Sequence, residues 1–254
     1  MRFTPRFFAA LALGAGLSAL AQAPAAHTAH WGYEGNNGPL NWHKLDEAYK
    51  SCADGKEQSP IDIRGAHLDK KLPPIEFHYI AGGVTVVNNG HSIQVNVHPG
   101  SYIQVGPDRY DLVQFHFHHP SEEAVKGKLS DLSVHLVHKS AEGKLAVVGV
   151  RMNEDINSPN ALLAAIWQHM PKEEGKSEEV TEALNPTGLL PADHGYWTFP
   201  GSLTTPPCSE GVRWFVMEEP MTLGKDQLQT FTRIYKMNTR PLQPLHGRKI
   251  LANE

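Results

Sequence analysis

FHFHHP occupies residues 115–120 and alternates aromatic with imidazole side chains. Because successive side chains of a strand point to opposite faces, His116 and His118 share one face while Phe115 and Phe117 share the other. The phenylalanines can then enter a core while the imidazoles face a cavity. Residues two apart lie about 7 Å from one another along a strand. That spacing allows both imidazoles to reach one metal ion at about 2.0–2.1 Å, so the stretch predicts a strand that carries two metal ligands.

A third ligand is expected from the next strand-like segment, SVHLVHKS at residues 133–140. Alternation there places His135 and His138 on opposite faces, and His135 is the one we assign to the metal. Three neutral imidazoles leave a fourth tetrahedral position free, which is the open arrangement of a catalytic zinc site. His119 is not counted as a ligand, because it points to the phenylalanine side or leaves the strand at the following proline.

Two other interpretations of these histidines stay open at this point. They could be ordinary, half-exposed strand residues that bind no metal. His116 and His118, followed by Glu122, also resemble the two-histidine-one-carboxylate set of cupin-like non-haem iron oxygenases. The second interpretation leaves His135 without a role, and the identity of the bound metal would distinguish iron from zinc.

Most of the remaining chain has the pattern of short strands separated by turns, with no internal repeat and no linker. Residues 83–97 alternate around Asn89 and Gly90, a strong hairpin signal. The other expected elements are strands at 111–117, 132–138 and 145–152, a helix that is capped by Ser158 and runs from Pro159 to residue 170, and a helix at 224–235. The balance predicts a mainly β (α+β) single domain, built on a large twisted, mostly antiparallel sheet with a few peripheral helices.

Residues 1–23 have the features of a signal peptide. Arg2 and Arg6 give a positive start, residues 7–20 are apolar and small, and Ala-Gln-Ala at residues 21–23 suits signal peptidase. The apolar run is about 14 residues long, shorter than the roughly 20 needed to span a bilayer. A retained anchor is the alternative, but we expect cleavage and a periplasmic or secreted protein.

The remaining part, residues 24–254, is large enough for one domain. Removal of two arginines changes the formal charge from −4 to −6. There is no basic run, so nucleic acid is not an expected partner. There is also no second long apolar segment, so we expect no membrane span after processing. Cys52 and Cys208 are an even pair, which in an oxidising compartment indicates one disulfide; two separate buried thiols are the alternative.

Five segments resemble signature segments of the α-class carbonic anhydrases, in the order of that family. They are QSPIDI at 58–63, NNGHSIQV at 88–95, QFHFHHPSEE at 114–123, VHLVH at 134–138 and GSLTTPPCSEGVRW at 201–214. The likeness extends from HWGYEGNNGPLNW at residue 30 to NTRPLQPLHGRKI, which ends at residue 250. It implies zinc-dependent, reversible hydration of carbon dioxide to bicarbonate and a proton. A silent, carbonic-anhydrase-like binding domain is a further alternative, but such a domain would be expected to lack a ligand histidine.

The resemblance implies a role for each residue that matches the family pattern. The Zn²⁺ ligands fall on His116, His118 and His135. Thr204 matches the threonine that orients the reacting oxygen, and Glu122 matches the carboxylate that accepts the proton of that threonine. A hydroxyl has a single donor, so its commitment to a carboxylate forces it to accept from the reacting oxygen. His91 matches the proton shuttle; a surface histidine beside a hairpin turn is the alternative.

The expected substrate is carbon dioxide or bicarbonate, which calls for a small and mainly apolar pocket. By resemblance its residues are Val137, Val147, Leu203, Thr204, Thr205, Val212 and Trp214. A Cys52–Cys208 disulfide would fasten the Thr204 loop to the N-terminal segment. The sequence leaves the oligomeric state open, a dimer included.

Two positions depart from the family pattern beside the predicted zinc site. Metal-bound histidines usually donate their second N–H to an oriented acceptor. For His116 that acceptor matches Gln114, but for His135 the chain has Ser133 where many members have a glutamate. Glu123 stands where a histidine is often found. A serine is short and uncharged, so we expect weaker zinc binding or activity, by about 10–100-fold.

Overall fold

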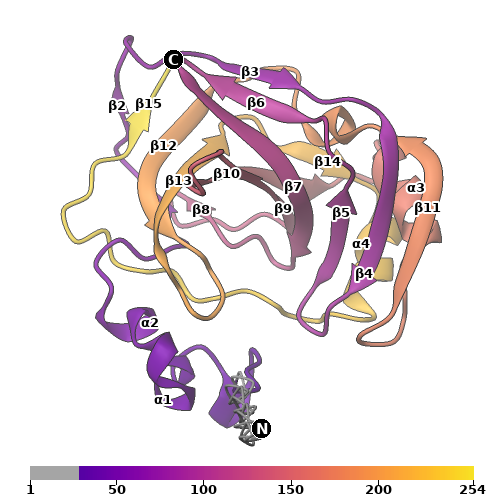
Figure 1. Ribbon diagram of the computed structural model, residues 1–254, viewed down its shortest axis with the longest axis horizontal. Helices are drawn as coiled ribbons and strands as arrows, with labels where there is room; N and C mark the ends of the chain where they lie inside the picture. The colour runs from indigo at the N-terminus through magenta and orange to yellow at the C-terminus, as the bar shows by residue number, and fades with distance from the viewer. Residues whose placement is uncertain (1–28) are drawn as a thin grey trace, which may run out of the picture.

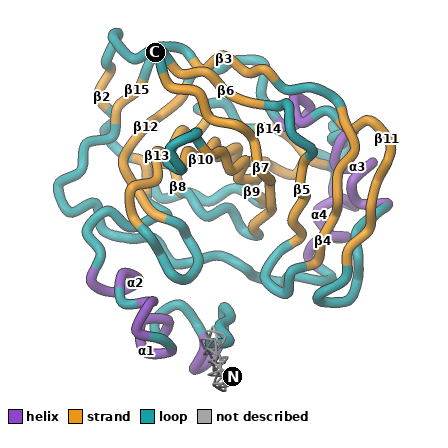
Figure 2. The backbone as a smooth tube through the Cα atoms, in the orientation of Figure 1, coloured by secondary structure: helices purple, strands orange, loops and turns teal. Residues whose placement is uncertain are grey.

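The computed structural model describes residues 29–254 as one large twisted sheet with short helices around it (Figures 1 and 2). The predicted signal peptide, residues 1–23, lies outside the described part. The strands of the large sheet run in the order β11-β4-β5-β7-β9-β10-β13-β12-β15-β2, with β3, β6 and β14 at its margins. The predicted fold class is confirmed.

The strands of the large sheet have the following bounds: β2 (His67–Leu68), β3 (Ile75–His78), β4 (Gly82–Asn88), β5 (Ile93–Val97), β6 (Tyr102–Val105), β7 (Asp108–His118), β9 (Leu132–Lys139), β10 (Leu145–Glu154), β11 (Ser177–Leu184), β12 (Tyr196–Ser202), β13 (Glu210–Met217), β14 (Met221–Leu223) and β15 (Leu251–Ala252). Most pairs are antiparallel, as expected. Three are parallel: β10 with β13, β10 with β14, and β15 with β2. A separate parallel pair joins β1 (Asp62–Ile63) to β8 (Ala124–Val125).

The central pair of strands, β7 and β9, brings the predicted ligands together. These strands are antiparallel, and their register places His116 directly opposite His135. The long β7 runs between β5 and β9 in the middle of the sheet (Figure 1). The hairpin predicted around Asn89 and Gly90 is also confirmed, because β4 and β5 pair from Asn88 and Ile93 outward.

The opposite face of β7 forms the main core. Phe115 and Phe117 are 1 % exposed or less and belong to the largest cluster of buried apolar side chains. Phe117 packs edge-on against Trp167 of α3, with ring centroids 4.8 Å apart. Burial of each phenylalanine contributes about 1.5–3 kcal/mol. This packing fixes the faces of β7 and therefore the direction of its two imidazoles.

Both predicted long helices are present: α3 (Ala161–Gln168) and α4 (Lys225–Thr232). The start expected for α3 at Ser158-Pro159 is two residues too early. Asn160 is the N-cap, because its side-chain oxygen accepts the N–H of Leu163 at 3.0 Å. The described residues also form two short α-helices, α1 (Trp42–Leu45) and α2 (Ser51–Asp54). Three 3-10 helices complete the set: η1 (Gly35–Asn37), η2 (Glu47–Tyr49) and η3 (Pro186–Leu189).

The N-terminal segment packs through a small cluster that contains Trp42, Tyr49 and both cysteines. Cys52 and Cys208 form a disulfide, as predicted. No helix within residues 29–254 is both long and apolar enough to cross a bilayer.

Candidate metal centre

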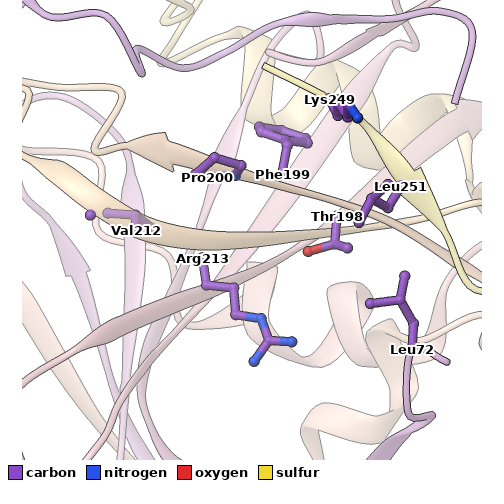
Figure 3. A pocket seen from close by; sticks show the side chains of 9 residues that line it. Leu72, Thr198, Phe199, Pro200, Val212, Arg213, Lys249 and Leu251 are labelled. Carbon is purple, nitrogen blue, oxygen red and sulfur yellow. The ribbon is translucent and has the colours of Figure 1, made fainter. Parts of the chain in front are cut away.

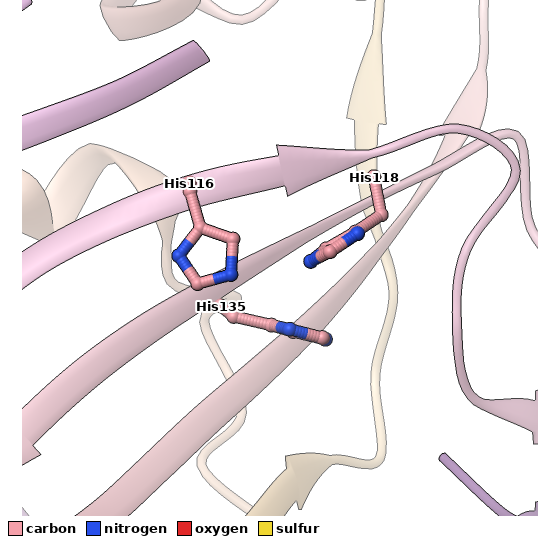
Figure 4. A group of neighbouring side chains, drawn as sticks. All are labelled: His116, His118 and His135. Carbon is pink, nitrogen blue, oxygen red and sulfur yellow. The ribbon is translucent and has the colours of Figure 1, made fainter. Parts of the chain in front are cut away.

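His116, His118 and His135 form a compact group of imidazoles between β7 and β9 (Figure 4). One nitrogen of each ring lies within 4.8 Å of those of the other two. The group arises because alternation along β7 puts two rings on one face and the register with β9 adds the third. Glu122 does not belong to this group, so the described residues form three histidines rather than a two-histidine-one-carboxylate set.

The outer nitrogen of each ring has a hydrogen-bond partner. His116 Nδ1 lies 2.9 Å from Gln114 Oε1, and His118 Nδ1 lies 2.8 Å from the main-chain oxygen of Asn238. His135 uses its Nε2, which is 3.2 Å from Glu123 Oε2. Because all three partners are acceptors, each outer nitrogen carries a proton, and the inner nitrogen of a neutral ring then keeps its lone pair.

The inner nitrogens fit a zinc ion. His118 Nε2 is buried and has no hydrogen-bond partner within the described residues. A buried nitrogen without a partner is costly unless something else binds it. Three converging imidazole lone pairs are the donor set of a catalytic zinc site. The residues present therefore fit the metal that the sequence predicts.

Burial keeps two of the three rings neutral. It lowers the pKa of His116 to about 3, with help from the nearby His135, and it lowers the pKa of His118 well below its usual value, with help from His135 and His116. Burial also acts to lower the pKa of His135, but Glu123 and Glu122 outweigh it and the net shift is upward. Two of the rings therefore offer a lone pair at neutral pH without first losing a proton.

Glu122 and Thr204 lie beside the histidines. Glu122 is 1 % exposed, and its Oε1 accepts the main-chain N–H of Arg240 at 2.9 Å. Burial raises the pKa of this carboxyl to about 7, while Thr204 acts to lower it. Glu122 Oε2 has no hydrogen-bond partner within the described residues. Thr204 is near enough to lower the pKa of this carboxyl, and one carboxyl oxygen is free to accept.

A cavity of about 250 Å³ opens above the histidines. Its lining includes the predicted apolar residues Val137, Val147, Leu203 and Trp214, together with Thr204, Thr205, Gln114 and His91. Carbon dioxide is small and neutral, so this mixture of an apolar wall and a few polar groups suits it.

Val212 is the exception among the predicted pocket residues. It is 2 % exposed and packs in a cluster with Val147 and Trp214, behind the cavity wall. It does not line this cavity but a separate hollow of about 360 Å³ (Figure 3). Val212 and Trp214 lie two residues apart on β13 and share one face of the strand, but only the larger indole reaches the cavity.

Ser133 does not pair with His135. Its hydroxyl oxygen accepts the main-chain N–H of Glu122 at 3.3 Å, whereas the partner of His135 is Glu123. The expectation that His135 would be poorly held rested on Ser133 being its only candidate. The sequence missed this pairing because Glu123 precedes β8 in a loop, and no strand periodicity relates that loop to His135.

Other residues at the site also escaped the sequence analysis. Trp31 and Tyr33 line the cavity from the N-terminal segment, and Trp31 stacks on His91. Asn238 accepts two hydrogen bonds: its main-chain oxygen accepts from His118 Nδ1, and its side-chain Oδ1 accepts the main-chain N–H of His119, both at 2.8 Å. Main-chain acceptors leave no pattern in side-chain identity, so no sequence signal could have shown the role of Asn238.

Comparison with known proteins agrees with this geometry. The sequence pattern of the family described as eukaryotic-type carbonic anhydrase matches residues 37–254. The chain is 42 % identical to a carbonic anhydrase of Pectobacterium carotovorum over 236 residues, which cover 92 % of this chain and 96 % of the relative. A carbonic anhydrase of Klebsiella pneumoniae is also 42 % identical, over 93 % of this chain and 97 % of the relative.

Solved structures give the same result. The α-carbonic anhydrase of Thermovibrio ammonificans, in complex with the inhibitor sulfanilamide, superposes with a TM-score of 0.85 at 42 % identity. The match covers 88 % of this chain and 99 % of that structure. The likeness therefore extends over the whole sheet and not only over the three histidines.

Proposed function

This chain belongs to the eukaryotic-type carbonic anhydrase family and catalyses the zinc-dependent, reversible hydration of carbon dioxide; from that premise we propose which of its residues do so. We propose that His116, His118 and His135 hold the zinc ion through their inner nitrogens. The observation that carries this is the convergence of three ring nitrogens within 4.8 Å, one of them buried and without any partner.

Zinc, when bound in this family, makes water acidic enough to supply a nucleophile at neutral pH. The acceptors on the outer nitrogens keep the three rings in one orientation. Gln114 does so for His116, and the main-chain oxygen of Asn238 does so for His118. Fixed rings hold the metal geometry without reorganisation during each reaction cycle.

Thr204 orients the attacking oxygen in this proposal. Its hydroxyl has one proton, and the free Oε2 of Glu122 is the neighbouring acceptor for it. With that proton committed, the threonine oxygen must accept a hydrogen bond from the attacking group, which aims that group's lone pair at the substrate. Arg240 N–H, bonded to Oε1, keeps the carboxylate in place.

Carbon dioxide binds against the apolar wall. Val137, Val147, Leu203 and Trp214 exclude water from one side of the cavity and offer no charge to retain bicarbonate after reaction. The main-chain N–H groups of Thr204 and Thr205 are the polar contacts at the edge of this wall. Val212 supports it from behind.

His91 carries the released proton toward solvent. It lines the same cavity, and histidine is the side chain whose usual pKa, about 6.5, suits proton transfer at neutral pH. Its side chain is not part of the three-histidine group, so it is free to take up and release protons.

We also propose export to the periplasm or beyond the cell, with the mature protein at residues 24–254. The positive, apolar and small-residue pattern of residues 1–23 supports this, and so does the disulfide, which persists in oxidising compartments. Mass spectrometry of the exported protein should find Pro24 at the N-terminus. Retention of residues 1–23 would contradict it.

The ligand set is tested by metal content and activity together. We expect about one zinc per chain in the purified protein and loss of both zinc and hydration activity in His118→Ala. His119→Ala is the matched control, because His119 is adjacent but bonds to the main-chain oxygen of Asp131 and lies outside the group. Full activity of His118→Ala, or equal loss of zinc in both variants, would contradict the proposed site.

A further inference from the structure

Glu123 is a fully buried carboxylate that the mechanism above does not use. Its exposed fraction is 0 %, and both of its oxygens lie 3.2 Å from His135 Nε2. It belongs to the loop between β7 and β8, not to the strand that carries His135. The carboxylate therefore reaches the imidazole from outside β9.

The loop that carries Glu123 is fixed on both sides. Ser121 Oγ donates to the main-chain oxygen of Glu123 at 3.0 Å and accepts the N–H of Ser130 at 2.8 Å. Immediately after Glu123, the N–H of Ala124 donates to the main-chain oxygen of Ile61 at 3.2 Å. A side chain between two anchored backbone segments has little freedom, so the Glu123 carboxylate is held in place before any metal binds.

Two small residues lie close to this carboxylate. Ser133 is fully buried, and its hydroxyl accepts the N–H of Glu122, the residue next to Glu123. Gly149 pairs with His135 across β9 and β10, and a Cβ at this glycine would lie 3.8 Å from Glu123 Oε2. Ser133 therefore helps to anchor the loop, and its small size keeps the space beside His135 open to the carboxylate.

A positive side chain lies near this buried carboxylate. Arg151 is 8 % exposed and sits opposite Ser133 in the β9–β10 register. Burial lowers the pKa of Arg151, and the negative charge of Glu123 opposes that shift. A buried carboxylate is costly unless it is paired and hydrogen-bonded. His135 supplies the hydrogen bond, and the charge of Arg151 acts on the carboxylate without direct contact.

We propose that Glu123 is the positioning residue for His135: its carboxylate accepts the Nε2–H and keeps Nδ1 aimed at the zinc site. This role rests on the ligand set proposed above. Ser133 contributes by holding the loop rather than by touching the imidazole. The chain thus supplies from a loop the acceptor that its own strand β9 lacks.

The test measures how fast zinc leaves the protein in excess chelator, together with thermal unfolding of the metal-free proteins. Glu123→Gln keeps the size of the side chain and removes its charge, and Glu123→Ala removes the acceptor. Both should release zinc faster, by about 10–100-fold. The double variant Glu123→Ala with Ser133→Glu places a carboxylate on β9, two residues from His135. It should release zinc more slowly than Glu123→Ala alone.

Two results would overturn the proposal: zinc release from Glu123→Gln at the wild-type rate, or a double variant that is no slower than Glu123→Ala. If Glu123→Ala does not fold, the isosteric Glu123→Gln decides. His118→Ala separates this proposal from the ligand set. If that variant also retains zinc, the ligand set is wrong; if it loses zinc while Glu123→Gln keeps it, only the role of Glu123 is wrong.

Discussion

The imidazole of His91 stacks on the indole of Trp31, with ring centroids 3.6 Å apart and planes inclined by 10°. The two residues come from different parts of the chain. His91 follows the β4–β5 turn, where its main-chain N–H donates to Asn89 Oδ1 at 2.9 Å, and Trp31 belongs to the N-terminal segment. The stack therefore joins the N-terminal segment to the proposed proton path.

Replacement of His91 by alanine should lower kcat for hydration and leave kcat/KM nearly unchanged. The reason is that attack on carbon dioxide precedes the transfer of the proton to solvent. Stopped-flow assays in weak buffer measure both constants, and added imidazole should restore the lost rate. Equal falls in kcat and kcat/KM would show that His91 acts in another step.

Trp31→Ala should raise the pKa of His91. Burial lowers this pKa at present, while the charge of Glu174 acts in the opposite direction. Loss of the indole exposes the imidazole, so the lowering by burial is reduced and the effect of Glu174 remains. Titration of His91 by NMR measures the shift, with Trp31→Phe as the control that keeps an aromatic ring. A pKa equal to that of the native protein would contradict the argument.

Reduction of the Cys52–Cys208 disulfide should lower the free energy of unfolding by about 2–4 kcal/mol. The bridge closes a loop of 156 residues, and Cys208 also donates its N–H to the main-chain oxygen of Thr205 at 2.8 Å. Activity should therefore fall with stability, because the Thr204–Thr205 loop loses an anchor. Urea unfolding with and without reductant tests this, and a Cys52→Ser, Cys208→Ser double variant should not respond to reductant. Alkylation of the native protein should find no free thiol.

His138 should make the protein less stable in acid. Burial lowers its pKa to about 3, against about 6.5 in the unfolded chain. Between these values the unfolded chain takes up a proton that the folded chain does not, so stability falls as the pH falls. From pH 6.5 to 5 this residue should cost about 1.5–2 kcal/mol.

The His138 prediction is measured by urea unfolding of metal-free protein at the two pH values. His138→Gln should show a smaller loss between them, although its stability at pH 7 also falls because Tyr79 Oη lies 2.8 Å from His138 Nε2. His67→Gln, which removes an exposed histidine from β2, is the control. An equal pH dependence in wild type and His138→Gln would refute the assignment.

The sequence by itself determined the central strands and the three histidines that lie together between them. Alternation in FHFHHP assigns Phe115 and Phe117 to the core and His116 and His118 to the opposite face, because a strand has a period of two residues. The Asn-Gly hairpin also followed from a local pattern. Strand alternation and turn signals depend on neighbours in the chain, which a sequence displays directly. The disulfide followed from the number of cysteines and the expected compartment, and the apolar residues of the cavity wall followed from the family resemblance.

Only the tertiary structure decided what surrounds those side chains. It placed Val212 at a separate hollow, brought Trp31 onto His91, and gave His135 the carboxylate of Glu123 instead of the hydroxyl of Ser133. The physical reason is that these contacts join loops and strands whose separation is set by sheet register and loop anchoring. Residue identity and spacing carry no direct record of such contacts, which only the packed chain defines.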